Sequence, residues 1–129
     1  MAKADGKIFN FDPPEKIKAD FLEVFPYKGE KQYITYKTKE FSAVCPFSGL
    51  PDIAEVVIEY IPKKFCLELK SLKYYFISYR NIGIYQEAVT NRIFKDLHKI
   101  LKPQYLKITT IYNTRGGIDA VCFIEKGKK

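Results

Sequence analysis

The stretch ELKSLKYYFISY, residues 68–79, decides the fold, because the spacing of apolar residues changes here from a strand pattern to a helical one. Four of its large apolar or aromatic side chains recur near one face of a helix. They are Leu69, Leu72, Phe76 and Tyr79. The sequence therefore predicts a helix over residues 68–79.

A second, longer helix is predicted over residues 84–101, after an interruption at Gly83. Its apolar residues recur at helical spacing and are Ile84, Ala88, Ile93, Leu97, Ile100 and Leu101. Lys99 and Lys102 lie where the negative end of the helix dipole favours cations, and Pro103 ends the helix. The two predicted helices thus follow one another directly.

Strands are predicted on both sides of this helical pair. Residues 32–44 and 53–61 are rich in β-branched and aromatic residues, and the short turn between them predicts an antiparallel hairpin. Residues 105–112 and 118–125 form a second strand pair, and the turn 113–117 contains the glycines that a positive φ requires. The order is β-β-α-α-β-β, an α+β arrangement. Its four-stranded sheet has open edges, which assembly of several copies would cover.

Residues 1–31 read as an N-terminal arm, and residues 32–129 as a single domain. Pro13, Pro14 and Pro26 argue against one continuous helix in the arm, although a short helical turn is compatible with them. We expect the arm to pack through its phenylalanines, which are Phe9, Phe11, Phe21 and Phe25.

Length and composition exclude several classes of protein. The chain has 129 residues, enough for one domain with its own core, and 47% hydrophobic and 29% charged residues argue against disorder. No apolar run approaches the roughly 20 residues of a membrane helix, and no signal peptide is recognisable. The expected location is the cytoplasm.

The cysteines are too few and too scattered for an intrachain zinc site. Cys45, Cys66 and Cys122 form no C-x-x-C pair, and His98 is the one histidine. We expect free thiols, with Cys66 and Cys122 in the core and His98 exposed on its helix. The alternative is a redox-active disulfide bond between Cys45 and Cys66.

The formal net charge of +7 favours an anionic partner, such as nucleic acid, a nucleotide or a phosphorylated cofactor. A basic RNA-binding module is one alternative, to which ten tyrosines would contribute. The sequence contains no aromatic-rich RNA-binding strand signature, which counts against that alternative.

The stretch VCPFSGLPD, residues 44–52, holds the candidate chemistry. Cys45 ends a predicted strand and Asp52 precedes the next one, so the two side chains can face each other across the turn. A cysteine attacks as its thiolate, and a neighbouring carboxyl group can give or take a proton. The alternative is a buried structural cysteine and a turn-forming aspartate.

Two further groups of polar residues lie on the predicted helices. Lys70 and Lys73 share one helical face and suit a phosphate-bearing ligand. The alternative is that they are ordinary solvent-exposed lysines. Glu87, at the start of the longer helix, either complements the helix dipole or accepts paired hydrogen bonds from the adjacent N–H donors of a guanine-like base.

Taken together, four stretches closely resemble the NADPH-dependent 7-cyano-7-deazaguanine reductases, the nitrile reductases of queuosine biosynthesis, in their short single-domain type. The stretches are CPFSGLPD (45–52), ELKSLKYYF (68–76), YRNIGIYQE (79–87) and TRGGI (114–118). The likeness runs from about residue 21 to residue 124. No Gly-rich dinucleotide motif occurs, so helix lysines would have to hold the NADPH.

The resemblance implies a tunnelling fold (T-fold), whose units assemble into barrels with active sites between subunits, here as a homo-oligomer such as a pentamer or decamer. Cys45 would form a covalent thioimide with the nitrile, and Asp52 would donate a proton. The implied substrate-binding residues are Leu67, Glu68, Leu69, Gln86 and Glu87, and the implied NADPH-binding residues are Lys70 and Lys73. The product would be the aminomethyl compound, at a cost of two NADPH, with no direct binding of nucleic acid.

One position departs from the pattern, because some members have histidine where this chain has Gln86. Glutamine can hydrogen-bond a substrate but cannot give a proton as imidazolium does. The nearest alternative activity is that of the archaeal amidinotransferases of tRNA modification. They share the cysteine and aspartate but lack the lysine-bearing stretch.

Overall fold

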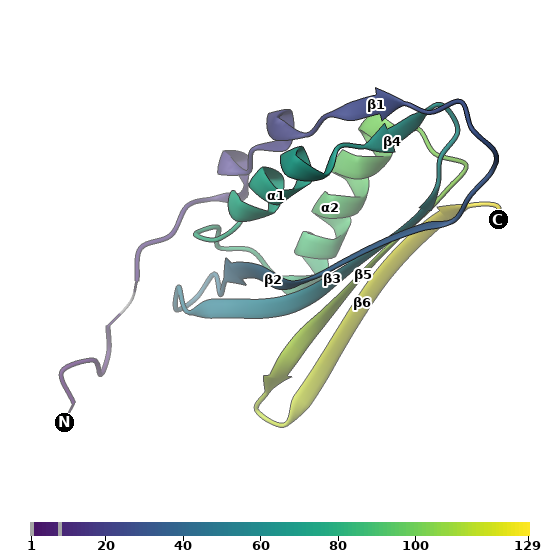
Figure 1. Ribbon diagram of the computed structural model, residues 1–129. Coiled ribbons are helices and arrows are strands. Elements are labelled where there is room, and N and C mark those ends of the chain that lie inside the picture. The colour runs from purple at the N-terminus through teal and green to yellow at the C-terminus, as the bar shows by residue number, and fades with distance from the viewer. Residues whose placement is uncertain (1, 8) are drawn as a thin grey trace.

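A computed structural model describes residues 2–7 and 9–129 and confirms the predicted α+β arrangement. The long elements are the strands β2 (Ile34–Val44) and β3 (Pro51–Ile61), the helices α1 (Leu69–Ile77) and α2 (Gln86–Leu101), and the strands β5 (Tyr105–Arg115) and β6 (Ile118–Gly127). Both helices lie on the same face of the sheet (Figure 1). No helix among the described residues is long and apolar enough to span a membrane.

Shorter elements add to this framework. Two 3-10 turns, η1 (Pro14–Lys16) and η2 (Ala19–Phe21), precede the strand β1 (Val24–Pro26), which pairs with β4 (Phe65–Leu67). This small second sheet was not predicted, because three-residue strands are too short to show an alternating pattern. It ties the N-terminal arm to the start of α1 (Figure 1).

The large sheet is antiparallel throughout, in the order β2-β3-β5-β6, so β2 and β6 are its edges. Both predicted hairpins are present. In the first, Ala43 pairs with Asp52. Between the hairpins, Ala54 of β3 pairs with Tyr112 of β5. Gly116 and Gly117, between β5 and β6, have φ values of 56° and 78°, as predicted for that turn.

The core lies between the helices and the helix-facing side of the sheet. Its largest fully buried side chains include Phe41, Ile58, Tyr60, Tyr75, Tyr79, Ile93, Leu97 and Leu106. The predicted apolar faces of the helices are partly wrong. Leu69 is 46% exposed and Ala88 is exposed, whereas Tyr75 is buried. Helix α1 therefore turns Leu72 and Tyr75 inward, and Tyr79, two residues after the helix ends, is buried as well.

The N-terminal arm packs differently from our expectation. Phe9, Phe21 and Phe25 are all exposed, and the buried side chains of the arm are Ile17 and Leu22 instead. These two residues lie next to the 3-10 turns, whose geometry could not be read from the apolar pattern.

Phe11 does pack as expected, and its contact explains Gly83. A Cβ atom at Gly83 would lie 2.2 Å from the Phe11 ring. The backbone pairs Asp12 N with Asn81 O at 2.8 Å and Gly83 N with Asp12 O at 2.9 Å. The arm therefore crosses the connection between α1 and α2 at a point where only glycine fits.

Candidate active site

The loop between β2 and β3 presents Cys45. The Cys45 N–H donates to the Leu50 carbonyl and the Gly49 N–H donates to the Cys45 carbonyl, both at 2.8 Å, which closes a tight turn. Gly49 has a φ of 73° and also lies against the backbone of Phe9, so a side chain there would be strained. The half-buried Cys45 side chain is held at the mouth of this turn.

The turn makes the Cys45 thiol more acidic than an ordinary cysteine. Backbone N–H groups of Ser48 and Phe47 lower the pKa of Cys45, while burial and the negative charge of Asp52 act in the opposite direction. The Phe47 nitrogen lies 3.5 Å from the sulfur. A lowered pKa means that more of the thiol is present as the nucleophilic thiolate at neutral pH.

Asp52 lies close enough to the Cys45 thiol for its negative charge to act on the sulfur. It pairs with Ala43, two residues before Cys45, so Cys45 and Asp52 are diagonal neighbours across the hairpin. Asp52 is only 7% exposed. Its carboxylate pairs with Arg115, whose Nη2 lies 2.7 Å from Oδ1. That Cys45 and Asp52 act together stays a prediction, and Arg115 is a neighbour of Asp52 that the sequence did not indicate.

Tyr112 flanks Asp52 from the other side. Since Tyr112 pairs with Ala54, it is diagonal to Asp52 on the helix-facing side of the sheet. Its hydroxyl is buried and has no hydrogen-bond partner among the described residues. Burial, followed by the negative charges of Asp52 and of Glu87 among others, raises the pKa of Tyr112 well above its ordinary value. The alternating pattern of β5 could have predicted from the sequence that Tyr112 faces inward. Its contact with Asp52 could not be predicted, because it depends on the register between β3 and β5.

The first turn of α2 joins the same group. The Ile84 N–H donates to the Val44 carbonyl at 3.2 Å, which ties the chain before α2 to the end of β2. The rings of Phe47 and Tyr85 pack edge to face, 5.9 Å apart. Gln86 is half-buried and Glu87 is exposed. The structure therefore places the cysteine loop next to the start of α2.

Glu68 is the N-cap of α1. Its carboxylate accepts hydrogen bonds from the N–H groups of Ser71 at 2.7 Å and Lys70 at 3.0 Å. These N–H groups, that of Ser71 first, lower the pKa of Glu68. Its neighbours differ in exposure, because Leu67 is buried and Leu69 is exposed.

These residues do not reach Cys45 within one chain. Glu68 precedes α1, while the cysteine loop lies near the other end of that helix (Figure 1). At about 1.5 Å per residue, the nine-residue helix alone is about 13 Å long. The structure therefore places Cys45, Asp52, Gln86 and Glu87 together but leaves Leu67, Glu68 and Leu69 apart.

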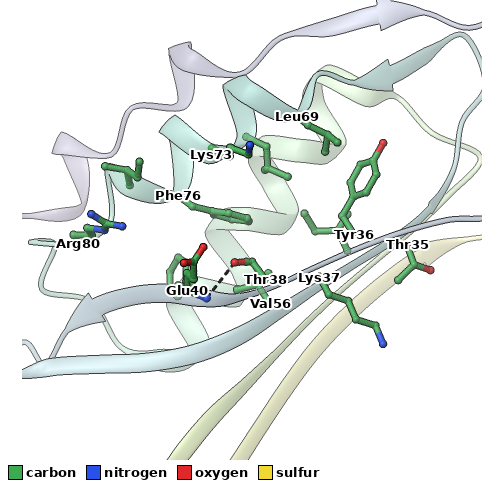
Figure 2. A pocket seen from close by; sticks show the side chains of 14 residues that line it. Thr35, Tyr36, Lys37, Thr38, Glu40, Val56, Leu69, Lys73, Phe76 and Arg80 are labelled. Atoms are coloured by element: carbon green, nitrogen blue, oxygen red, sulfur yellow. Dashed lines mark hydrogen bonds between the residues drawn. The ribbon is translucent and has the colours of Figure 1, made fainter.

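The two candidate cofactor lysines border different hollows. Lys73 lines a groove of about 540 Å³ between α1 and the edge strand β2, together with Phe76 and Arg80 (Figure 2). Lys70 lines a second hollow of about 550 Å³ beside Glu68. The two side chains are both exposed. They could therefore contact separate parts of one extended anionic ligand.

The burial of the remaining cysteines and of the histidine differs in part from the prediction. Cys66 is buried on β4, as expected, but Cys122 is only half-buried on the edge strand β6, so its assignment to the core was wrong. Cys66 lies next to the start of α1, at the far end from Cys45, and both thiols are free. His98 is half-buried and stacks on Phe94 at 5.5 Å between ring centroids, which corrects the expected exposure. No metal-binding cluster occurs among residues 2–7 and 9–129.

Comparisons with known proteins agree with one another. The family model for QueF-like proteins matches residues 51–129, more than half of the chain. The chain is 56% identical over 119 residues to the NADPH-dependent 7-cyano-7-deazaguanine reductases of Thermotoga petrophila and Thermotoga maritima, covering 92% of this chain and 87% of each relative. It is 49% identical over 106 residues to the reductase of the same name from Caldicellulosiruptor bescii, covering 81% of both chains.

A solved structure supports the fold. The chain superimposes on the archaeosine synthase QueF-Like in its apo form with a TM-score of 0.67, covering 80% of this chain and 99% of that chain. The sequence identity is 24%, so this likeness concerns the fold alone.

Proposed function

The chain belongs to the QueF-like family, and we propose from this premise that it reduces the nitrile of 7-cyano-7-deazaguanine to an aminomethyl group with NADPH. The observation that carries the proposal is the acidified Cys45 thiol next to Asp52, in a chain 56% identical to curated reductases of that name. The amidinotransferase alternative is not favoured, since the archaeosine synthase likeness supports only the fold.

Cys45 performs the first chemical step in this proposal. A nitrile carbon accepts hydride poorly until a nucleophile has added to it. The Cys45 sulfur attacks that carbon, and Asp52 protonates the nitrogen, which gives a covalent thioimide with a C=N bond. Two NADPH molecules, when bound in turn, would each supply one hydride. Between the two reductions the S–C bond breaks, which frees the Cys45 thiol and lets the product leave as the aminomethyl compound. The half-buried site limits the access of water to the intermediates.

Carboxylates and backbone groups recognise the deazaguanine ring. Glu87 and Glu68 can each accept parallel hydrogen bonds from ring N–H and amino groups, and Gln86 supplies neutral hydrogen bonds. Leu67 and Leu69 flank Glu68 and complete the ring pocket through backbone and apolar contacts. Any proton transfer by Gln86 is excluded by its amide chemistry.

The separation along α1 suggests that a second copy completes each site. One chain would contribute Cys45, Asp52, Gln86 and Glu87, and its neighbour would contribute the residues around Glu68. Both edges of the large sheet, β2 and β6, are open for pairing with other copies. We therefore propose a homo-oligomeric T-fold barrel, such as a pentamer or decamer, located in the cytoplasm.

Lys70 and Lys73 are the proposed phosphate ligands of NADPH. Both lysines are exposed, and each borders a different hollow beside α1. This arrangement suits a ligand that carries phosphates at two places. This is consistent with the excess of basic residues and needs no nucleic acid as a partner.

Intact-protein mass spectrometry tests the covalent step. The protein is mixed with 7-cyano-7-deazaguanine without NADPH, and we expect one adduct, located on Cys45 by peptide mapping. Cys45→Ala removes the adduct and the NADPH oxidation, whereas the control Cys122→Ala retains both. Wild-type protein that oxidises NADPH without ever forming the adduct would contradict the thioimide mechanism.

A further inference from the structure

Arg115 reaches from the end of β5 to the start of β3. Its Nη2 lies 2.7 Å from Asp52 Oδ1 and also donates to the carbonyl oxygen of Pro51. The side chain of Arg115 is 47% exposed, whereas that of Asp52 is 10% exposed. The cation thus lies at the rim of the site, and the carboxylate it holds lies inside.

The surroundings of Asp52 are otherwise short of positive charge. The groups that face it are the Cys45 thiol at the end of β2 and the Tyr112 hydroxyl on β5, with Glu87 of α2 beyond the tyrosine. Each of these is neutral or negative. Among the described residues, Arg115 is the ion-pair partner of Asp52.

In the proposed addition, Asp52 acts first as a base, in its carboxylate form, and then as an acid. The S–H bond of Cys45 breaks as its proton passes to the Asp52 carboxylate. The S–C bond then forms, the C≡N bond becomes C=N, and the nitrogen takes that same proton from Asp52. The thiol proton ends on the nitrogen, Asp52 returns to its carboxylate, and no oxidant or reductant is required.

Resting on the proposed covalent step, we propose that Arg115 is a positioning residue that orients the Asp52 carboxylate to receive the Cys45 proton. A largely buried carboxylate is destabilised when it has no charged or hydrogen-bonded partner. Without the guanidinium, nothing among the described residues holds the Asp52 side chain in its present orientation by an ion pair. The second hydrogen bond, to Pro51, fixes the guanidinium relative to β3.

The test measures the rate of adduct formation with 7-cyano-7-deazaguanine in the absence of NADPH. Arg115→Ala is expected to slow the addition by about tenfold or more, part of the 10²–10⁴ that a positioned acid–base group contributes. Arg115→Lys should restore part of the rate, since it retains the charge but not the guanidinium geometry.

Asp119→Asn is the matched control. Asp119 is exposed on β6, two residues after the β5–β6 turn, and accepts a hydrogen bond from Thr114 on β5, so its replacement perturbs this hairpin without touching Asp52. Its adduct rate should equal that of the wild type. Thermal unfolding of all variants verifies that they are folded.

The outcomes separate this inference from the proposed function. If the wild type forms no adduct, the covalent mechanism itself fails. If the wild type forms the adduct and Arg115→Ala forms it equally fast, the positioning role is wrong. An arginine that only contacted NADPH would give this second result, because NADPH is absent from the assay.

Discussion

At the scale of single residues, the acidity of Cys45 is a balance of opposing influences. The N–H groups of Ser48 and Phe47 favour the thiolate, whereas burial and, less strongly, the negative charge of Asp52 oppose it. The N–H groups prevail, so the pKa of Cys45 is lowered. The proposed proton donor therefore opposes ionisation of the proposed nucleophile.

This balance predicts opposite effects of Asp52→Asn on two reactions of Cys45. Alkylation by iodoacetamide reports the thiolate alone, and its pH midpoint should fall, because the charge that raises the pKa of Cys45 has been removed. Formation of the nitrile adduct should fall by about 10²-fold or more, because proton transfer is lost. Mass spectrometry follows both reactions on Cys45. A parallel decrease in both would mean that Asp52 serves only to hold the loop.

Two buried tyrosines should respond in opposite ways to the loss of a hydroxyl. The Tyr112 hydroxyl has no hydrogen-bond partner within residues 2–7 and 9–129, so Tyr112→Phe should leave the free energy of unfolding unchanged or raise it by up to about 1 kcal/mol. The Tyr60 hydroxyl accepts from the Leu67 N–H at 3.0 Å, so Tyr60→Phe should cost about 1–3 kcal/mol. Urea denaturation measures both values. Destabilisation by Tyr112→Phe would show that its hydroxyl has a partner in solution.

At the scale of elements, the sequence was informative where a pattern repeats. The long strands and helices were predicted to within a few residues, because periods of 2 and 3.6 persist over nine or more residues in each. The strands β1 and β4 have three residues each, too few for any period. The start of α1 was set by the Glu68 cap and not by the apolar pattern.

The cysteine loop should be more sensitive to one glycine than the second hairpin turn is to another. Gly49 and Gly116 both have positive φ, so alanine costs about 1–2 kcal/mol of strain at either position. At Gly49 the new Cβ would also lie 2.5 Å from the Phe9 carbonyl oxygen, whereas Gly116 faces open space. Gly49→Ala should therefore lower both the thermal midpoint and the adduct rate more than Gly116→Ala. Equal effects on the midpoint would rule out the Phe9 contact.

At the scale of the whole molecule, the sequence indicated candidate functional residues. It did not indicate which of them lie close together within one chain. The hairpin turn between Cys45 and Asp52 is local, so their proximity was predictable. The proximity of Arg115 and Tyr112 to Asp52 depends on the pairing of β3 with β5, which no local pattern specifies. The separation of Glu68 from Cys45 depends on the path of α1.

That separation makes the oligomeric site testable by complementation. Cys45→Ala removes the nucleophile, and Glu68→Gln removes a charge while keeping an oxygen that can cap α1. Each variant alone should be nearly inactive. If neighbouring copies share each site, co-expression with two different affinity tags should yield mixed oligomers in which about a quarter of the sites combine an intact Cys45 with an intact Glu68. NADPH oxidation should then recover to a corresponding fraction of the wild-type rate. Since a site within one chain would always carry one of the two defects, inactive mixed oligomers would contradict the shared site while leaving the adduct chemistry of Cys45 intact.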